Sequence, residues 1–190
     1  MDGVMISADD EAALVGRARA GDPDAYALLV RRHAPMAMRT AALLGAGASA
    51  EDVVQEALVK AYRSLDGFRD GRPFRPWLLR IVANEAHNVH RSFVRRAARE
   101  QRMIPPELLD PAGEVVQRED KERLLRAVGR LPDKLRTAVT CRYLLELDEA
   151  ETAVVLGVPR GTVKSRLSRG LERLRTELEA VSPDQEAGHV

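Results

Sequence analysis

The sequence predicts an all-α protein made of two small helical domains joined by a flexible linker. Apolar residues recur at helical spacing along nearly the whole chain, and the alternating pattern typical of strands is absent. Alanine, leucine, arginine and glutamate, which favour helices, dominate the composition. The proline-rich stretch "MIPPELLDPAGEVVQRED" interrupts this pattern beyond the middle of the chain. We therefore predict a first domain at 10–98, a linker at 99–118, a second domain at 119–178 and a disordered tail at 179–190.

Local capping signals mark the helices of the first domain. In "GDPDAYALLVRRHA", Asp22 is placed to cap a helix and Pro23 occupies its first position, where the missing N–H costs nothing. Pro35 lies inside the same pattern, so the helix is expected to kink or restart there. Ser49, followed three residues later by Asp52, predicts a capped start for the next helix.

A long helix is predicted from about Arg75 to Arg99, after the loop "DGFRDGRPFRPW". Ten arginines stand against four acids between Arg63 and Arg102. One stripe of the helix is polar and mostly basic, and the other, together with Trp77, is expected to enter the core. The polar stripe is Arg80, Asn84, His87, Arg91 and Arg95, and the apolar stripe is Leu78, Val82, Ala86, Val89 and Phe93.

The second domain is predicted to contain helices at about 118–130, 132–145 and 148–156, followed by a basic helix. The stretch "GVPRGTVKSRLSRGLERLR" holds six basic residues and one acid, although the whole chain has a net charge of only +1. A short helix, a turn at Gly157-Val158-Pro159 and a longer helix form a helix-turn-helix pattern. The face expected to enter the core consists of Val163, Leu167, Leu171 and Leu174.

The opposite face of the basic helix combines cations with small hydroxyl residues. Arginine and lysine neutralise phosphates or hold guanine edges, and small hydroxyl residues permit close approach to the groove. Recognition helices commonly contact bases through their N-terminal half, which here runs from Arg160 to Arg169. This composition predicts binding to duplex DNA.

These stretches resemble a known family. "LPDKLRTAVTCRYLLELDEAETAVVLGVPRGTVKSRLSRGLERLR" is similar to region four of sigma-70-type factors, and "SAEDVVQEALVKAYRSLDGFRDGRPFRPWLLRIVANEAHN" is similar to region two. In this order, with a linker between them, they resemble an extracytoplasmic-function (ECF) sigma factor over residues 10 to 178. The resemblance implies binding to core RNA polymerase, recognition of promoter DNA and help in opening it.

The resemblance also assigns residues of region two. An acidic and amide-bearing helix face is expected to dock on core polymerase, near Glu51, through Asp52, Gln55 and Glu56. The loop before the long helix and the start of that helix are expected to read the minus-ten element and to hold a flipped base. The positions expected to do so are Ser64, Phe68, Arg80, Ile81, Asn84, His87 and Arg91.

Region four is expected to read the minus-thirty-five element in the major groove. The implied contacts are Arg160, Thr162, Lys164, Ser165, Ser168 and Arg169. Two positions depart from the family pattern. Glu151-Thr152 stands where a Glu-Ile-Ala run is usual, and Ser168 is smaller than in some members. The resemblance also implies an anti-sigma factor as a partner.

Two other classes of protein compete with this interpretation. A stand-alone helix-turn-helix regulator would explain the C-terminal pattern, although the first hundred residues lack the strand–helix alternation of a receiver domain. An enzyme would need a catalytic or metal site. His87 and His90 could share a metal with Glu85 or His33, but no third ligand follows in a recognisable pattern. Cys141 is expected to be a buried core thiol. We therefore expect no cofactor and no catalytic activity.

Composition and the N-terminal sequence indicate the cellular compartment of the protein. A single cysteine among 190 residues rules out a disulfide within the chain and favours a reducing compartment. The N-terminal residues are acidic where a signal peptide would be basic. Apolar runs fall far short of the ~20 residues that cross a bilayer. We expect a cytoplasmic protein without membrane insertion.

Overall fold

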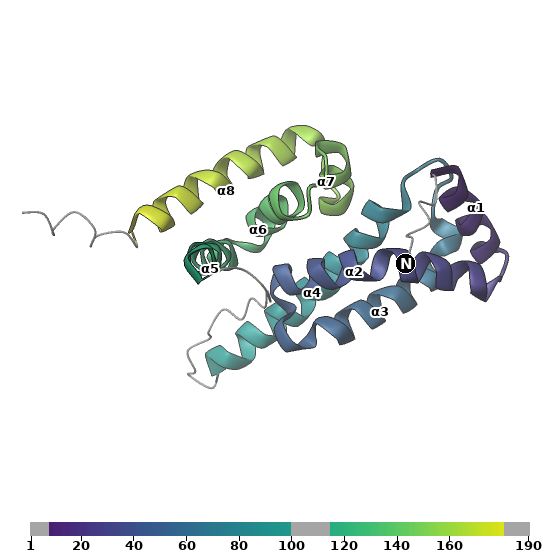
Figure 1. Cartoon of the computed structure of the whole chain (residues 1–190), viewed down its shortest axis with the longest axis horizontal. Coiled ribbons are helices and arrows are strands. Elements are labelled where there is room, and N and C mark those ends of the chain that lie inside the picture. Colours follow the sequence, from purple (N-terminus) through teal and green to yellow (C-terminus); the bar gives the residue numbers. More distant parts are fainter. Residues whose placement is uncertain (1–7, 100–114, 181–190) are drawn as a thin grey trace, which may run out of the picture.

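The computed structural model describes residues 8–99 and 115–180, and the residues within these two ranges form helices and no strand, as predicted (Figure 1). The first range forms the N-terminal unit and the second forms the C-terminal unit. The helices of the N-terminal unit are α1 (Ala8–Arg19), α2 (Pro23–Ala41), α3 (Ala50–Arg63) and α4 (Phe74–Arg99). Those of the C-terminal unit are α5 (Val115–Arg130), α6 (Asp133–Val139), α7 (Glu149–Leu156) and α8 (Arg160–Ala180).

The start of α2 is capped as predicted. Asp22 Oδ1 accepts hydrogen bonds from the backbone N–H groups of Asp24 at 3.0 Å and Ala25 at 3.1 Å. The bond from the Ala25 N–H, followed by the bond from Arg17, holds the pKa of Asp22 below its usual range. The helix then continues through Pro35 to Ala41, so the predicted restart at Pro35 is wrong. Packing of α2 against α3 and α4 maintains the helix although proline removes one backbone hydrogen bond.

The predicted side-chain cap at Ser49 is also wrong. Its backbone, at φ −89° and ψ 10°, lacks the extended conformation of an N-cap, and its side chain makes no capping hydrogen bond. The chain instead enters α3 through a π-helical turn at Ala42–Ala46 and a 3₁₀ turn at Gly47–Ser49. The Ala50 N–H therefore donates to the Gly47 carbonyl.

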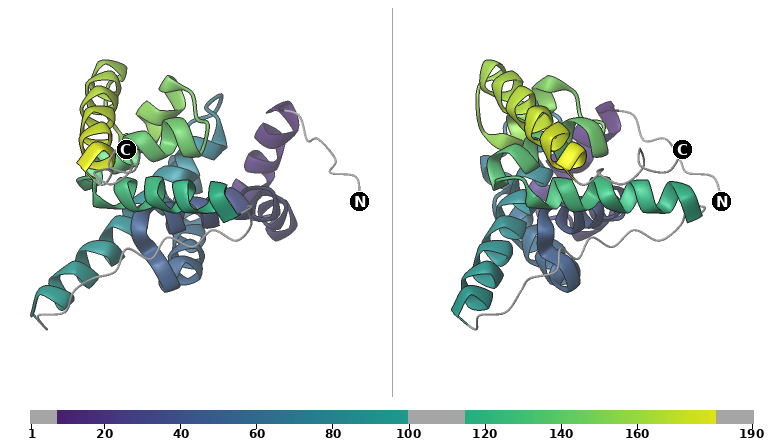
Figure 2. Two further views of the ribbon diagram at one scale, coloured as in Figure 1. Left: turned by 60° about the vertical axis from the view of Figure 1, so that its left-hand side comes forward. Right: turned by 90° about the vertical axis from the view of Figure 1, so that its left-hand side faces the viewer.

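The core of the N-terminal unit lies where α2, α3 and α4 meet. Leu78, Val82 and Ala86 of α4 are fully buried, as their spacing predicts. Phe93, the last member of that stripe, is 53% exposed, so its predicted core position is wrong. The C-terminal part of α4, to which Phe93 belongs, projects beyond the other helices (Figures 1 and 2).

In the C-terminal unit, α8 packs against α6 and α5. Leu174 and Val163 of α8 are buried as predicted and Leu167 is partly buried, but Leu171 is 43% exposed. Its predicted core position is wrong because the α8 surface that meets α6 passes through Gly170 instead. A Cβ atom on Gly170 would lie 2.7 Å from Val139 Cγ2, so the two helices approach closely at this glycine.

The two units pack against each other. One contiguous apolar cluster joins the N-terminal core to four buried residues of the C-terminal unit, Cys141, Leu145, Leu147 and Val155. The helices α4 and α7 contribute most of this contact. Burial raises the pKa of the Cys141 thiol to about 12, in keeping with the expected core thiol.

The predicted linker and tail fall largely outside the described residues. Of the linker at 99–118, Arg99 belongs to α4 and residues 115–118 belong to α5, which begins earlier than predicted. Of the tail at 179–190, residues 179 and 180 close α8.

Gly170→Ala tests the close contact of α8 with α6. Alanine favours helix by about 1 kcal/mol, but its Cβ would overlap Val139, itself buried among helices. We expect the free energy of unfolding to fall by about 1–2 kcal/mol. Gly161→Ala is the matched control, because no atom lies within 4 Å of its added Cβ. Urea denaturation followed by circular dichroism measures both, and equal stability of the two variants would contradict the close contact.

Candidate nucleic-acid and polymerase interfaces

The expected polymerase-binding residues lie on one exposed face of α3. The apolar face of this helix, which includes Val53, Val54 and Ala57, is buried against α2 and α4. The opposite face presents Asp52, Gln55 and Glu56 to solvent. Glu56 pairs with Lys60 at 3.3 Å, whose Nζ also contacts Glu85 of α4 at 2.8 Å. The face therefore carries exposed acid and amide groups on a helix fixed from behind.

The expected minus-ten residues lie along α4 and at the end of α3. Ser64, Arg80, Asn84 and Arg91 are exposed, and Ile81 is half-buried against the core. The Nη2 of Arg91 donates to the Asn88 side chain at 2.9 Å. Arg80, Asn84 and Arg91 follow one side of α4, as the spacing predicted.

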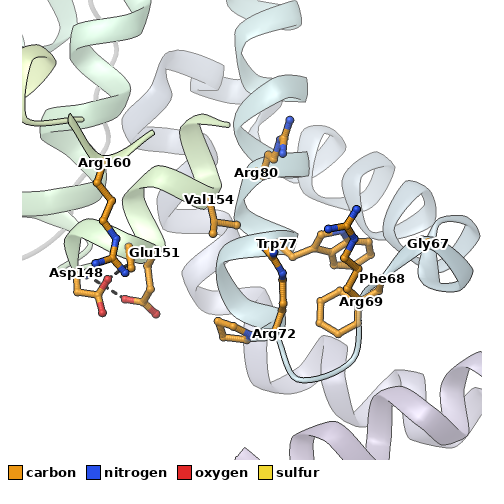
Figure 3. Close-up of a pocket in the computed structure, with 12 residues that line it drawn as sticks. Gly67, Phe68, Arg69, Arg72, Trp77, Arg80, Asp148, Glu151, Val154 and Arg160 are labelled. Carbon is orange, nitrogen blue, oxygen red and sulfur yellow. Dashed lines mark hydrogen bonds between the residues drawn. The ribbon is translucent and has the colours of Figure 1, made fainter. Parts of the chain in front are cut away.

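Phe68 lies deeper than a surface base platform. It is only 7% exposed and packs edge-on against Phe74 and Trp77, with ring centroids 5.8 and 5.1 Å away. Trp77 is half-buried and packs on the same core, as expected. Phe68 and Trp77 both line a pocket (Figure 3).

An arginine that the sequence did not single out holds the loop before α4. Arg19, at the end of α1, donates to the backbone carbonyl of Phe68 at 2.7 Å and to that of Leu65 at 3.3 Å. It also pairs with Asp70 at 3.0 Å. Its positioning role is visible only in three dimensions, because 49 residues separate Arg19 from Phe68.

The first helix of the helix-turn-helix, α7, is capped at both ends. Asp148 and Glu151 form a reciprocal capping box at its start. At its end, Gly157 adopts the left-handed conformation with φ 64°, and Val158 N–H donates to Ala153 O at 3.1 Å. This Schellman arrangement fixes the angle between α7 and α8. The unusual Thr152 is fully buried, and its hydroxyl has no hydrogen-bond partner among the described residues.

The six expected minus-thirty-five residues all lie in the N-terminal half of α8. Five of them are exposed and Thr162 is half-buried. The Ser165 hydroxyl donates to the Thr162 carbonyl at 3.0 Å, and Lys164 lies 3.9 Å from Glu149. The exposed five are Arg160, Lys164, Ser165, Ser168 and Arg169. The arrangement combines a rigid helix, a basic surface and short hydroxyl side chains, as entry into a major groove requires.

The structure also brings α4 against this motif, in an arrangement that the sequence did not predict. Arg75 forms an ion pair with Glu151. A Cβ atom on Gly157 would lie 2.8 Å from Arg80 Nη2, so Arg80 lies directly on the turn between α7 and α8. We call the contact of α4 with α6 and α7 the inter-unit interface.

Two histidines of α4 complete the inter-unit interface. His87 Nε2 lies 2.8 Å from the Thr137 hydroxyl, and His90 Nε2 lies 3.3 Å from Arg136 Nη1. Arg136 is 2% exposed and is held by Asp133 at 2.6 Å and by the Gly129 carbonyl at 3.2 Å. The histidines therefore face the C-terminal unit, and among the described residues no cluster of three or more potential metal ligands occurs.

Burial lowers the pKa of both histidines. For His87, Asp133 opposes this effect, while Arg136, Arg91 and His90 reinforce it. For His90, Arg136 adds to the effect of burial, and Asp133 and a hydrogen bond with the Gly45 backbone oppose it. Burial next to a guanidinium therefore favours the neutral form of both rings.

Comparison with known proteins agrees with this arrangement. The family model for sigma-70 region 2 matches residues 29–100, and that for sigma-70 region 4 matches residues 121–174. The ECF RNA polymerase sigma-E factor of Escherichia coli K12 is 33% identical over 177 residues, covering 87% of this chain and 93% of the relative. That of Haemophilus influenzae is 34% identical over 181 residues, covering 88% and 94%.

The chain belongs to the ECF family of sigma-70-type factors. It is therefore a sigma factor that directs transcription initiation by RNA polymerase, and the stand-alone regulator is not favoured.

Solved structures of the family share the arrangement of helices. CnrH in complex with the cytosolic domain of CnrY matches with a TM-score of 0.69 and 26% identity, over 90% of this chain and 99% of that one. The sigma factor RpoE of Bartonella quintana, in complex with the anti-sigma factor NepR, matches with a TM-score of 0.67 and 26% identity, over 82% and 98%.

Lowering the pH is predicted to weaken the inter-unit interface. Because the pKa of His87 and His90 is lowered from 6.5, their contribution is complete above pH 6.5 and is lost as the pH falls below it. Glu11, paired with His33 inside the N-terminal unit, has its pKa lowered from 4.5 and acts only at lower pH. The emission of Trp77, the single tryptophan, should therefore change as the pH falls below 6.5.

The variant His87→Gln/His90→Gln keeps polar side chains at the inter-unit interface and removes both titrating rings. Its Trp77 emission should stay constant across the same pH range, whereas that of the unaltered protein should change. An identical pH response in the double variant would show that these histidines do not control the interface.

Proposed function

We propose that this sigma factor reads two promoter elements with surfaces on separate units while α3 holds core RNA polymerase. The exposed N-terminal half of α8, set by the capped turn at Gly157, carries the proposal. It would enter the major groove at the minus-thirty-five element. The side of α4 that bears Arg80, Asn84 and Arg91 would follow the backbone and bases of the minus-ten element.

Binding to both elements would require the two units to separate. Arg80 rests on the turn at Gly157, although its side chain stays exposed, and His87 is half-buried against Thr137, so the C-terminal unit occupies this side of α4 in the packed arrangement. The expected polymerase-binding face of α3, which bears Asp52, Gln55 and Glu56, remains exposed in the same arrangement. We therefore infer an order of events in which polymerase engages α3 first and DNA binding follows separation of the units.

An anti-sigma factor is the second proposed partner. The similar RpoE is in complex with the anti-sigma factor NepR, and CnrH is in complex with the cytosolic domain of CnrY. By analogy, we propose that such a protein binds this chain in the cytoplasm, where polymerase and chromosome are. No helix in the described residues is long and apolar enough to span a membrane.

Transcription from a fragmented genomic library, with purified protein and bacterial core polymerase, tests the proposal. Transcript starts that share upstream motifs at two fixed distances would support it and give the promoter sequence. Failure to co-elute with core polymerase and to start transcription would overturn it. Binding of α5–α8 residues to duplex DNA without polymerase would then point to the stand-alone regulator.

Reversing a charge on α3 should weaken binding to core polymerase. We expect Asp52→Lys to reduce affinity by about tenfold or more, because a like charge would face a basic partner. Glu122→Lys on α5 is the matched control, since Glu122 is exposed and pairs with Arg126 at 3.5 Å. Fluorescence anisotropy of labelled protein titrated with core enzyme measures both. Similar losses in the two variants would exclude α3 as the specific docking surface.

Removing one cation from α8 should weaken binding to the minus-thirty-five element. We expect Lys164→Ala to lower the affinity of the holoenzyme for promoter duplex and to reduce the slope of log affinity against log salt by about 1. Lys134→Ala, an exposed lysine on α6, is the control and should keep the slope of the unaltered protein. An unchanged slope for Lys164→Ala would remove this residue from the phosphate contacts.

A further inference from the structure

A pocket opens between the two units, at the edge of the inter-unit interface. Its volume is about 680 Å³, within the range of roughly 300–1,000 Å³ that is typical of small-molecule sites. One wall comes from the loop before α4 and the first turns of α4, and the other comes from α7 and the start of α8 (Figure 3). The pocket therefore exists only while the units are packed together.

The pocket favours an anion. Four arginines line it, Arg69, Arg72, Arg80 and Arg160. The side chains of Arg69, Arg72 and Arg80 make no hydrogen bond or ion pair with other residues that the structure describes. Two acids also line the pocket: Asp148 and Glu151 hold the start of α7, Glu151 pairs with Arg75, and Asp148 interacts electrostatically with Arg160.

The pocket also favours a flat ring. Trp77 and Phe68 form an aromatic surface on one wall, and Val154 faces it from α7 (Figure 3). Aromatic and apolar side chains can stack on any nucleobase, because every base has a flat π-face. Guanidinium groups placed around the ring hold phosphates through charge-assisted hydrogen bonds. The combination fits a base that carries several phosphates.

We propose that this pocket binds a free nucleoside polyphosphate, with the base against Trp77 and the phosphates held by Arg72 of the loop and Arg160 of α8. The ligand would contact both units and so would stabilise their packed arrangement. By linkage, the packed arrangement with ligand would oppose the separation that promoter binding needs. The inference goes beyond the sigma activity, because it assigns a ligand to the form that does not hold DNA.

Single-stranded DNA carries the same chemical groups, bases and phosphates, as a free nucleotide. The two walls of the pocket allow an experiment to distinguish these two ligands. A strand read by α4 depends on the N-terminal unit alone. A free nucleotide in the pocket depends on both walls, so its affinity responds to changes in α8 as well. Arg160→Ala therefore separates the two ligands, because Arg160 lies outside the α4 surface.

Isothermal titration calorimetry of the full chain with GTP tests the proposal. Trp77 fluorescence, corrected for absorption of light by the nucleotide, is a second readout. We expect saturable binding of GTP, with weaker binding of guanosine and of inorganic tripolyphosphate. Arg72→Ala and Arg160→Ala should each weaken GTP by about tenfold or more, as loss of a charge-assisted contact predicts. Arg31→Ala, an exposed arginine of α2 outside the pocket, should bind GTP like the unaltered protein.

Binding of a single-stranded oligonucleotide with the minus-ten sequence is measured for comparison with binding of GTP. Its affinity should be unchanged by Arg160→Ala, and saturating GTP should weaken it. No saturable GTP binding, or GTP binding that survives Arg160→Ala, would overturn the pocket. Co-elution with core polymerase in nucleotide-free buffer reports on the sigma activity separately, so failure of the pocket and failure of the proposed function give different results.

Discussion

The packing of α4 on two sides holds this molecule together. One side buries Leu78, Val82 and Ala86 in the N-terminal core. The other side carries Arg80, His87 and His90 against the C-terminal unit. Because residues spaced by three or four share a helix face, one continuous helix can present both surfaces without a break. The orientation of the C-terminal unit therefore depends on how the N-terminal core fixes α4.

The inter-unit interface combines two kinds of contact. Cys141, Leu145, Leu147 and Val155 extend the apolar core across it, and such burial is favourable but has little direction. The polar contacts around Arg136 supply direction. A guanidinium that is 2% exposed needs hydrogen bonds to offset its desolvation, and Asp133, Gly129 and His90 provide partners for Nη1 and Nη2, while Nε has none among the described residues. A shift of α4 relative to α6 would leave this charge without one of them.

Much of the fold could be predicted from local patterns. The cap at Asp22, the extent of α4, and the turn at Gly157 depend on a few adjacent residues, and the structure confirms all three. Pro35 and Ser49 show the limit of such rules, since tertiary packing carried α2 through the proline and a 3₁₀ turn replaced the side-chain cap. Local helix propensity is a weak constraint, because tertiary packing can override it.

The errors in the predicted core have a shared physical cause. Helical spacing identifies the apolar side of a helix but does not show where its neighbour ends. Phe93 continues the correct stripe past the end of the bundle, and Leu171 lies beside the true contact at Gly170. Arg19 and Arg136 escaped prediction because their partners are remote in sequence or because a buried arginine has no sequence signature.

The same residues serve the packed arrangement and the proposed promoter contacts, and this couples the two energetically. If Arg80 and His87 must leave the C-terminal unit before they touch DNA, the apparent affinity for promoter is reduced by the fraction of molecules in which the units are apart. A partner that binds the separated form more tightly removes that reduction. The surface on α3 is exposed in the packed form, so polymerase can engage it first, and contacts that it makes only with the separated units would then shift the population. Once both units are held on one polymerase, two modest DNA surfaces gain from their high effective concentration. Free protein would then bind promoter weakly even though every side chain that reads it is present, and the strength of the inter-unit interface would set how weakly.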